Sequence, residues 1–285
     1  MKLAPDTLAS SLRPGHKILL LAPSLADVPP SFCNVTSAPE RHSRLLADAQ
    51  RFRGRIYLED GAVSPGELTP DGRHHQASDL RGWHVLAVGD ATSVHGCARC
   101  ICQTTRVPFS DLAVGKSALA LSDKWGNKVR RATEDTLDEV IHGGHAFGEL
   151  GGWAIAPKLR CTTEMLRIAF STWALVRLLG IRVLFSTATR RHCSASILRK
   201  LGGRSVVVDG TEIPHYYEPR YGCDMELLRF DQLDNPPAPL KPRMHELQSW
   251  LATVPVLCGA LQRRENQGAF AEFPMERDLD LIAHA

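Results

Sequence analysis

The chain has 285 residues and carries 34 lysines and arginines against 31 aspartates and glutamates, which gives a formal net charge of +3 with histidine neutral. Hydrophobic residues make up 44% and charged residues 23%, so the composition excludes a disordered chain and predicts a folded core. No run of about five like charges and no basic stripe interleaved with aromatic residues occurs, which argues against a nucleic-acid-binding protein.

Several features of the sequence bear on the cellular location. No stretch of about 18 apolar residues could cross a membrane, and the first residues, with Asp6 and Arg13, do not have the pattern of a secretory signal. The eight cysteines are irregularly spaced, and a chain of this length needs no disulfide bonds, so we expect reduced thiols. We therefore expect a cytoplasmic protein with no integral membrane segment.

The first 72 residues predict one helix, one short strand and a long loop. Residues 1–36 form a proline-containing lead-in with a strand at 18–21. Apolar residues recur at helical spacing over 37–53, whereas 55–58 has an extended pattern. The glycine- and proline-rich stretch 61–72 predicts a mobile loop, and a loop of this kind can act as a substrate lid.

Strands and helices follow one another clearly from residue 83 onward. The pattern predicts an antiparallel hairpin of strands 83–88 and 93–104 and then a helix over 124–141 that ends at a Gly-Gly pair. The next predicted elements are strand 146–155, helix 163–179, strand 181–187, helix 192–201 and the strands 205–208 and 225–230. This order is typical of an α/β domain.

The proline content suggests where the domain ends. We expect one domain over 37–231, a proline-rich linker over 232–243 and a C-terminal extension over 244–285. The extension predicts a helix over 244–263, which could dock on the domain or form a homodimer. Its mixed charges make it a poor membrane anchor.

Two segments near the end of the domain carry a family resemblance. Residues 191–203 read RHCSASILRKLGG and residues 213–231 read IPHYYEPRYGCDMELLRFD. Together they resemble the long-chain N-acyl amino acid synthases, a branch of the GCN5-related N-acetyltransferase (GNAT) fold that is related to acyl-homoserine lactone synthases. The resemblance is strong over 149–231, loose over 51–148 and absent from the C-terminal helix. It implies an α/β (α+β), GNAT-like fold of three layers, in which helices flank a mixed, splayed central sheet.

The resemblance also implies a function. Such an enzyme is an acyltransferase, and specifically an N-acyltransferase that moves a long-chain fatty acyl group from the thioester of acyl carrier protein or coenzyme A to the amine of an amino acid or a similar small amine. The acyl-phosphopantetheine thioester is then a substrate, and no cofactor is bound permanently. Acyl carrier protein is the expected macromolecular partner.

The catalytic residues that the resemblance implies lie mainly on the strand 146–155. Glu149, in the sequence GELGGW, is the expected general base, because an amine must lose a proton before or during its attack on a carbonyl carbon. The backbone N–H groups of Trp153 and Ala154 are expected to bind the oxyanion, and His192 at the start of the next helix could stabilise the departing thiolate. A surface position for Glu149 and a structural role for His192 are the alternatives.

Donor binding is expected at the turn before the helix 163–179. Ordinary acetyltransferases hold the pyrophosphate of coenzyme A there on glycine-rich backbone, but residues 157–164 contain no glycine and carry basic side chains instead. This suits the phosphopantetheine arm of a carrier protein at least as well as coenzyme A, and a plain helix cap is the alternative. The expected donor-binding residues are Ile155, Lys158, Arg160, Cys161, Thr162, Thr163 and Arg191.

Acceptor binding is expected from the first half of the domain and from the aromatic loop 213–223. Arg99 is the candidate for holding an amino acid carboxylate, since a guanidinium group can donate two parallel hydrogen bonds to it. An outward-facing strand arginine is the alternative. The expected acceptor-binding residues are Arg53, Tyr57, Asp79, Trp83, Arg99, Tyr217 and Tyr221.

Two other functions and one metal-like motif need to be weighed. Gly152 stands near where lactone synthases have an arginine, so an acyl-homoserine-lactone-type signal synthase is less favoured; a non-catalytic module that binds acyl carrier protein or acyl-CoA is the alternative outside enzymes. Residues 95–102 read HGCARCIC, but no second cysteine pair follows, and strand alternation separates Cys97 from Cys100 and Cys102. We therefore expect no metal site.

Overall fold

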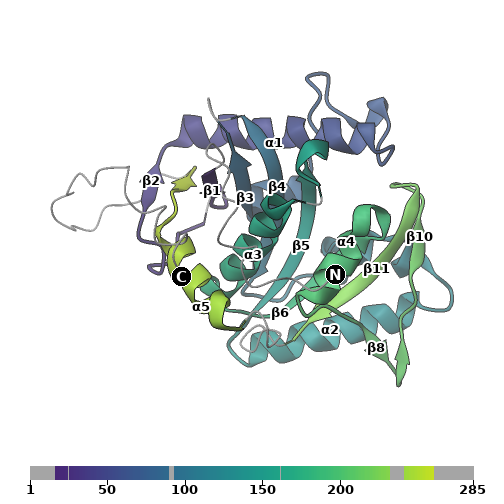
Figure 1. The fold of residues 1–285 in the computed structure, drawn as a ribbon. Helices are drawn as coiled ribbons and strands as arrows, with labels where there is room; N and C mark the ends of the chain where they lie inside the picture. The colour runs from purple at the N-terminus through teal and green to yellow at the C-terminus, as the bar shows by residue number, and fades with distance from the viewer. Residues whose placement is uncertain (1–16, 25, 90–92, 161, 232–240, 260–285) are drawn as a thin grey trace.

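Figure 1 shows the computed structural model of the chain, which describes residues 17–24, 26–89, 93–160, 162–231 and 241–259. Within these residues a ten-stranded mixed sheet forms the centre of the molecule. Its main path runs in the order β10 (Tyr216–Glu218), β11 (Cys223–Phe230), β6 (Ile181–Thr189), β5 (Ala146–Ile155), β4 (Val94–Gln103), β3 (Gly82–Val88), β1 (Lys17–Leu21), β12 (Val256–Cys258) and β2 (Val35–Ser37). The short strand β7 (Arg204–Ser205) also pairs with β11, and β8 (Val207–Val208) forms a separate hairpin with β9 (Thr211–Glu212).

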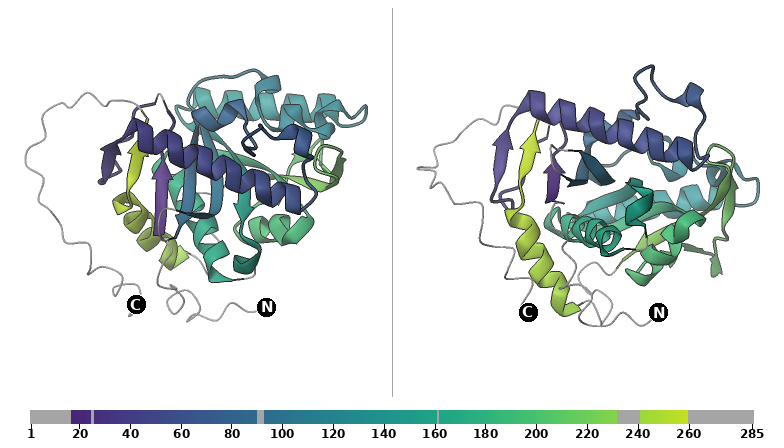
Figure 2. Two further views of the ribbon diagram at one scale, coloured as in Figure 1. Left: turned by 90° about the horizontal axis from the view of Figure 1, so that it is seen from above. Right: turned by 45° about the horizontal axis from the view of Figure 1, so that its top comes forward.

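Helices cover both faces of this sheet. They are α1 (Pro39–Glu59), α2 (Gly126–His142), α3 (Thr163–Leu178), α4 (Ser194–Lys200) and α5 (Lys241–Thr253). Two residues of β4 show which helix covers which face of the sheet. Arg99 lies near Arg53 of α1, whereas a Cβ added at Gly96 on the opposite face would lie 2.2 Å from Ile168 of α3. Hence α1 and α3 lie on opposite faces, with α2 on the side of α1 and α4 on the side of α3. Figure 2 shows α1 crossing the strands of the sheet.

Helix α1 is longer than its sequence pattern suggests. The stretch 55–58 continues the helix to Glu59, so the prediction of an extended segment there is wrong. The reason is packing, since Phe52 and Ile56 continue the buried stripe that Leu45 and Ala49 begin at helical spacing. A run of four residues is too short to distinguish a strand from one turn of a buried helix.

The C-terminal part of the chain returns to the sheet. Helix α5 ends at Thr253, two residues before a proline, and β12 then pairs in parallel with both β1 and β2. The predicted helix over 244–263 is therefore wrong in its second half, where three buried residues form a strand. The strand predicted at 18–21 is confirmed as β1, and most of the predicted linker, 232–240, lies outside the described residues.

The central sheet opens between its two middle strands. Strands β5 and β6 pair in parallel from Ala146 and Ile181 to Leu150 and Ser186, and no further pairs follow, although β5 still pairs with β4 as far as Ile155. This is the mixed, splayed sheet flanked by helices that the sequence predicted, and the predicted fold class is confirmed. The opening exposes backbone on one side of β5, which in a closed sheet would be paired.

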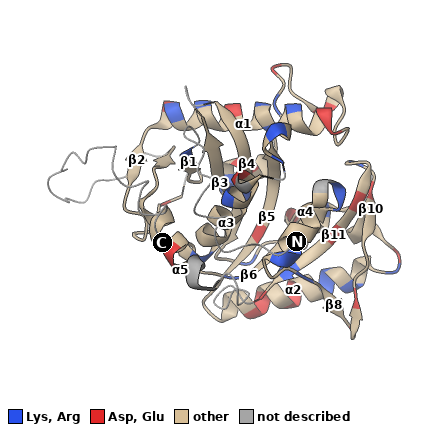
Figure 3. Cartoon of the chain, in the orientation of Figure 1, with Lys and Arg blue, Asp and Glu red and all other residues tan. Residues whose placement is uncertain are grey.

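Charge is mixed over the described surface. Figure 3 shows basic and acidic residues alternating along α1, whereas in α2 the basic residues lie in the first half and the acidic residues in the second. The predicted loop 61–72 contains a short 3-10 turn over Pro65–Glu67, and its mobility remains a prediction. None of the described helices combines the length and the apolar character that a membrane span requires.

Candidate active site

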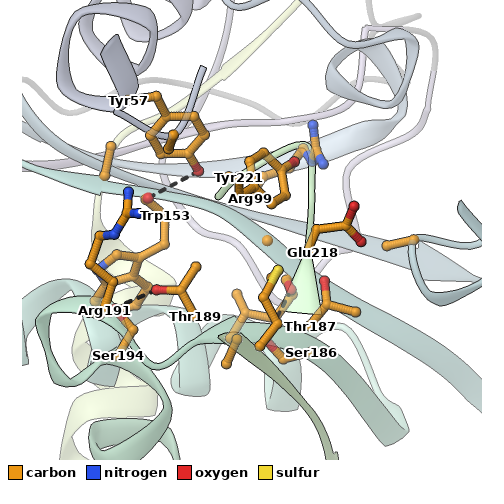
Figure 4. Close-up of a pocket in the computed structure, with 18 of the residues that line it drawn as sticks. Tyr57, Arg99, Trp153, Ser186, Thr187, Thr189, Arg191, Ser194, Glu218 and Tyr221 are labelled. Atoms are coloured by element: carbon orange, nitrogen blue, oxygen red, sulfur yellow. Dashed lines mark hydrogen bonds between the residues drawn. The ribbon is translucent and has the colours of Figure 1, made fainter. Parts of the chain in front are cut away.

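A cavity of about 430 Å³ lies where β5 and β6 separate. Residues from both faces of the sheet line it, with Arg99 and Glu149 on the α1 face and Ala188 and Leu198 on the α3 face. Figure 4 shows polar side chains from α1, β4, β5, β6, α4 and β10 around this space. A ligand in the cavity could therefore pass through the opening in the sheet.

The cavity brings together about half of the residues that the sequence analysis selected. Those that line it are Tyr57, Arg99, Glu149, Trp153, Ala154, Ile155, Arg160, Arg191 and Tyr221. Arg53 and Asp79 do not line it but are buried directly behind Arg99. Cys161 lies outside the described residues, as do the side chains of Thr163 and His192.

Four of the selected residues have other surroundings. Trp83 is a core residue that stacks on Phe32 with 4.9 Å between the ring centroids, and it does not line the cavity. Tyr217 is 59% exposed and Lys158 is also exposed. Thr162 caps α3, because its hydroxyl accepts a hydrogen bond from the backbone N–H of Glu164.

Glu149 is a buried carboxylate in the cavity wall. It shares a face of β5 with Phe147, which packs into the core beneath α2, so strand alternation places the carboxylate just beyond that core. The side chain is 5% exposed and accepts a 2.5 Å hydrogen bond from the backbone N–H of Ala113. Burial raises the pKa of Glu149 to about 7, although the Ala113 N–H and the Arg99 guanidinium oppose the rise.

The residues of β5 that follow Leu150 contain a β-bulge. Arg99 pairs with Gly151 and Cys97 with Ala154, so β5 has one residue more than β4 in this interval. Gly152 adopts the left-handed backbone conformation that the bulge requires, with φ at +61°. A Cβ at this position would lie 3.2 Å from the Cβ of Arg99. Beyond Leu150, the backbone of β5 on the β6 side has no partner strand and can donate to a ligand.

A buried ion cluster lies behind Arg99 on the α1 face of the cavity. The carboxylate of Asp79 accepts hydrogen bonds from Arg53 at 2.7 and 3.0 Å and from Arg99 at 2.5 Å. Burial alone would raise the pKa of Asp79, but the two guanidinium groups bring it well below its usual range. Burial lowers the pKa of both His74 and His84 to about 4, so these neighbours are neutral near pH 7. The cluster therefore has one positive charge in excess.

Two arginines, Arg160 and Arg191, also line the cavity. Arg160 forms a 2.8 Å ion pair with the carboxylate of Asp60, at the end of α1. Arg191, just before α4, donates to the backbone carbonyls of Asp60 at 2.5 Å and Gly222 at 3.1 Å. Asp60, Arg160 and Arg191 line the cavity, and Gly222 does not. These contacts hold both arginines in place in the cavity wall.

Sequence reasoning missed a second buried carboxylate. Glu218 is 2% exposed, lines the cavity and accepts hydrogen bonds from the backbone N–H of Ala118 at 2.8 Å and from Arg220 at 3.2 Å. Strand alternation in β10 could have revealed Glu218, because it turns Tyr217 outward and its neighbours Tyr216 and Glu218 inward. The loop between β4 and α2 carries no functional motif in its sequence, yet the backbone N–H of Ala113 within it holds Glu149.

The cysteine motif forms no metal site in the described part of the chain. There, no group of three His, Cys, Asp or Glu side chains is placed to hold a metal ion. Cys97 and Cys100 both belong to the core, but the Cys97 thiol donates to the carbonyl oxygen of Gly152 in the bulge, whereas the Cys100 thiol donates to that of Ile101. The two thiols therefore have different partners, as strand alternation predicts.

Comparisons with known proteins give structural likeness only. No family model and no curated protein matches the chain. Solved structures similar to it include BjaI, a CoA-dependent acyl-homoserine lactone synthase (TM-score 0.49, 12% identity, 87% of this chain and 96% of that chain), and MesI, another such synthase (0.49, 16%, 85% and 98%). FeeM, an N-acyl amino acid synthase from uncultured soil microbes, is also among them (0.45, 10%, 79% and 98%). Both kinds of synthase named by the sequence resemblance thus occur among these structures.

Proposed function

We propose that the protein is an N-acyltransferase that moves a fatty acyl group from a phosphopantetheine thioester to the amine of an amino acid or a similar small amine. The observation that carries the proposal is the position of Glu149. A buried carboxylate whose pKa lies near 7 stands beside the opening in the sheet, in a cavity that reaches both faces. A thioester arriving from the α3 face and an amine arriving from the α1 face would meet there.

The chemistry follows from the groups around this carboxylate. Ionised Glu149 accepts a proton from the acceptor ammonium, and the free amine attacks the thioester carbonyl carbon. The oxyanion of the tetrahedral intermediate accepts hydrogen bonds from the unpaired backbone of β5 between Trp153 and Ile155. The C–S bond then breaks, the departing thiolate takes up the second proton that the nitrogen loses as the amide forms, and Glu149 releases the first proton to solvent. Arg191 lines the cavity on the donor side and would stabilise the thiolate.

The ion cluster favours an acceptor that carries a carboxylate. Arg99 lines the cavity, and its guanidinium group shares Asp79 with Arg53, so the wall carries one positive charge in excess whenever the nearby Glu149 is protonated. A buried positive charge without its own counter-ion is costly, and an anionic substrate would relieve that cost. An α-amino acid, bound through its carboxylate with its amine near Glu149, meets this requirement.

The donor side favours a single phosphate. The N-terminus of α3 is capped by Thr162, and Glu164 in its first turn is 2% exposed and paired with Arg167 at 3.0 Å. A carboxylate at this position repels the pyrophosphate that a helix N-terminus would otherwise attract. Arg160, which is paired with Asp60, and Arg191 line the cavity and would hold the one phosphate of a carrier-bound phosphopantetheine arm. Acyl carrier protein is therefore the donor and partner that we propose, in preference to coenzyme A.

One experiment tests the class of reaction and names both substrates. Solvent extracts of bacteria that express the wild type or Glu149→Gln would be searched by mass spectrometry for fatty acyl amides of amino acids. We expect such amides with the wild type only. Comparable amounts with the variant would remove Glu149 as the base, and none from either strain, with folded protein in both, would contradict acyl transfer.

A binding module that senses acyl carrier protein or acyl-CoA is the second candidate. The self-capped N-terminus of α3 and the loop without glycines favour it, because both depart from the usual donor site. It gives no reason for a carboxylate such as Glu149, whose burial opposes ionisation. Tight binding of acyl carrier protein with no product would support this module. A lactone-forming signal synthase uses the same donor and is disfavoured by the glycine at position 152.

A further inference from the structure

The bulge in β5 is held by two side chains from neighbouring elements, each of which donates a hydrogen bond to its backbone. The thiol of Cys97 on β4 donates to the carbonyl oxygen of Gly152 at 3.4 Å. The hydroxyl of Tyr57 on α1 donates to the next carbonyl oxygen, that of Trp153, at 3.1 Å, as Figure 4 shows. Two consecutive peptide groups are thus fixed from outside the strand. Backbone carbonyls of a regular strand would be bound by a neighbouring strand instead.

The contact at the Gly152 carbonyl also fixes the direction of the Trp153 N–H, because both groups belong to one planar peptide. In a planar trans peptide the C=O and the N–H point in opposite directions, and the described residues contain no cis peptide. Since the Gly152 carbonyl points to the Cys97 thiol, which lies on the α1 face of β4, the Trp153 N–H points away from that thiol and from β4. The strand on that other side is β6, which has already separated from β5 beyond Leu150. The Trp153 N–H therefore points toward the opening.

Both side chains keep the proton that they donate. Burial raises the pKa of the Cys97 thiol to about 11 and also raises the pKa of Tyr57. At neutral pH Cys97 is therefore a thiol and Tyr57 a phenol, and neither bond depends on pH near 7. Tyr57, which the sequence analysis placed among the acceptor-binding residues, has its hydroxyl engaged by the backbone of β5.

We propose that Cys97 and Tyr57 are positioning residues that hold the β5 bulge so that the Trp153 N–H meets the oxyanion formed during transfer. The inference rests on the proposed acyl transfer. A donor aimed in advance at developing charge strengthens its bond in the transition state, whereas a loose one must first be ordered. Removing either contact should therefore lower kcat more than it changes the binding of the two substrates.

The test uses the full chain with four substitutions. We expect Cys97→Ala and Tyr57→Phe to lower kcat by about 10- to 100-fold, less than the loss of a whole oxyanion donor, with each KM within about threefold of wild type. Cys97→Ser restores a donor and should recover most of kcat. Cys100→Ala is the control, because this buried thiol on the same strand donates to the carbonyl oxygen of Ile101 and not to one of the bulge, and we expect it to leave kcat unchanged.

The outcomes separate this inference from the proposed function. If Cys97→Ser is as slow as Cys97→Ala, or if both KM values rise while kcat is retained, the positioning role is wrong. If the wild type transfers no acyl group, the proposed function fails instead, and the backbone amide resonance of Trp153 in NMR spectra still tests the contacts. That resonance should shift in Cys97→Ala and Tyr57→Phe and return toward wild type in Cys97→Ser. An unshifted resonance in the first two variants would overturn the inference.

Discussion

Replacing Glu149 by glutamine should make the protein more stable and less active. The carboxyl group has an ordinary pKa of 4.5 and a pKa of about 7 in the fold, because burial disfavours its charged form. Above pH 7 the group is ionised in both states, and the folded state carries the full cost of a buried charge. Below pH 4.5 it is protonated in both states and the cost vanishes. Glutamine resembles the protonated form and can still accept the hydrogen bond from Ala113.

The two pKa values set the size of the effect. The folded protein gains about 3 kcal/mol from Glu149→Gln at pH 8.5 and less than about 1 kcal/mol at pH 5. For a urea slope of about 3 kcal/mol per molar, the midpoint of unfolding should rise by about 1 M at the higher pH. The sign is as informative as the size, because most buried substitutions destabilise a protein.

Urea unfolding of the wild type and the variant from pH 5 to pH 8.5 is the assay. Glu218→Gln is the matched control, since it makes the same change to a second buried carboxylate in the same cavity. That carboxylate has a cation partner, Arg220, so its loss should destabilise the protein at neutral pH. A Glu149→Gln variant that is no more stable than the wild type at pH 8.5 would refute the reasoning.

Three further substitutions have defined outcomes. Asp79→Asn leaves Arg53 and Arg99 without their shared carboxylate, so the free energy of unfolding should fall by about 3 to 5 kcal/mol in urea; an unchanged midpoint would contradict the ion cluster. Gly152→Ala adds a Cβ at positive φ, 3.1 Å from Arg53, and should cost about 1 to 2 kcal/mol in the same assay; wild-type stability would argue against the bulge. Arg99→Gln should raise KM for an amino acid about tenfold but not KM for its decarboxylated amine, and equal effects on both would exclude carboxylate binding.

The sequence predicted much of the fold because the relevant signals are local. Strand 146–155 matches β5 at both ends, and the helix at 163–179 matches α3 to within one residue, since glycines and long apolar runs mark their limits. The family resemblance placed Glu149 on β5, and the structure buries it in the cavity. Local sequence patterns were sufficient to predict β5 and α3, and the family resemblance was sufficient to place Glu149 on β5.

Other features depend on contacts between distant parts of the chain. Strand β12 has only three residues and exists because β1 and β2 lie on either side of it. Trp83 was expected in the acceptor site because of its residue type, but packing against Phe32 places it in the core. No periodicity in one segment could reveal either result, because the partners are far away in sequence.

The hydrogen bond that holds Glu149 was equally beyond local reasoning. Its donor, the Ala113 N–H, lies 36 positions earlier, in a series of short 3-10 turns between β4 and α2. The bracing of the bulge by Tyr57 joins residues 96 positions apart. Sequence patterns show which residues could act, and the fold decides which of them meet.

The pH dependence of amide formation by the purified protein tests the central claim most directly. Acyl carrier protein loaded with a fatty acyl group and a saturating amino acid would be the substrates, with the wild type and Glu149→Gln compared from pH 5.5 to pH 9. We predict that the wild-type rate rises with pH through a midpoint near 7, as Glu149 ionises, and that this step is absent from a much slower variant. A wild type that forms no amide, or a variant that is as fast and has the same step, would contradict the account.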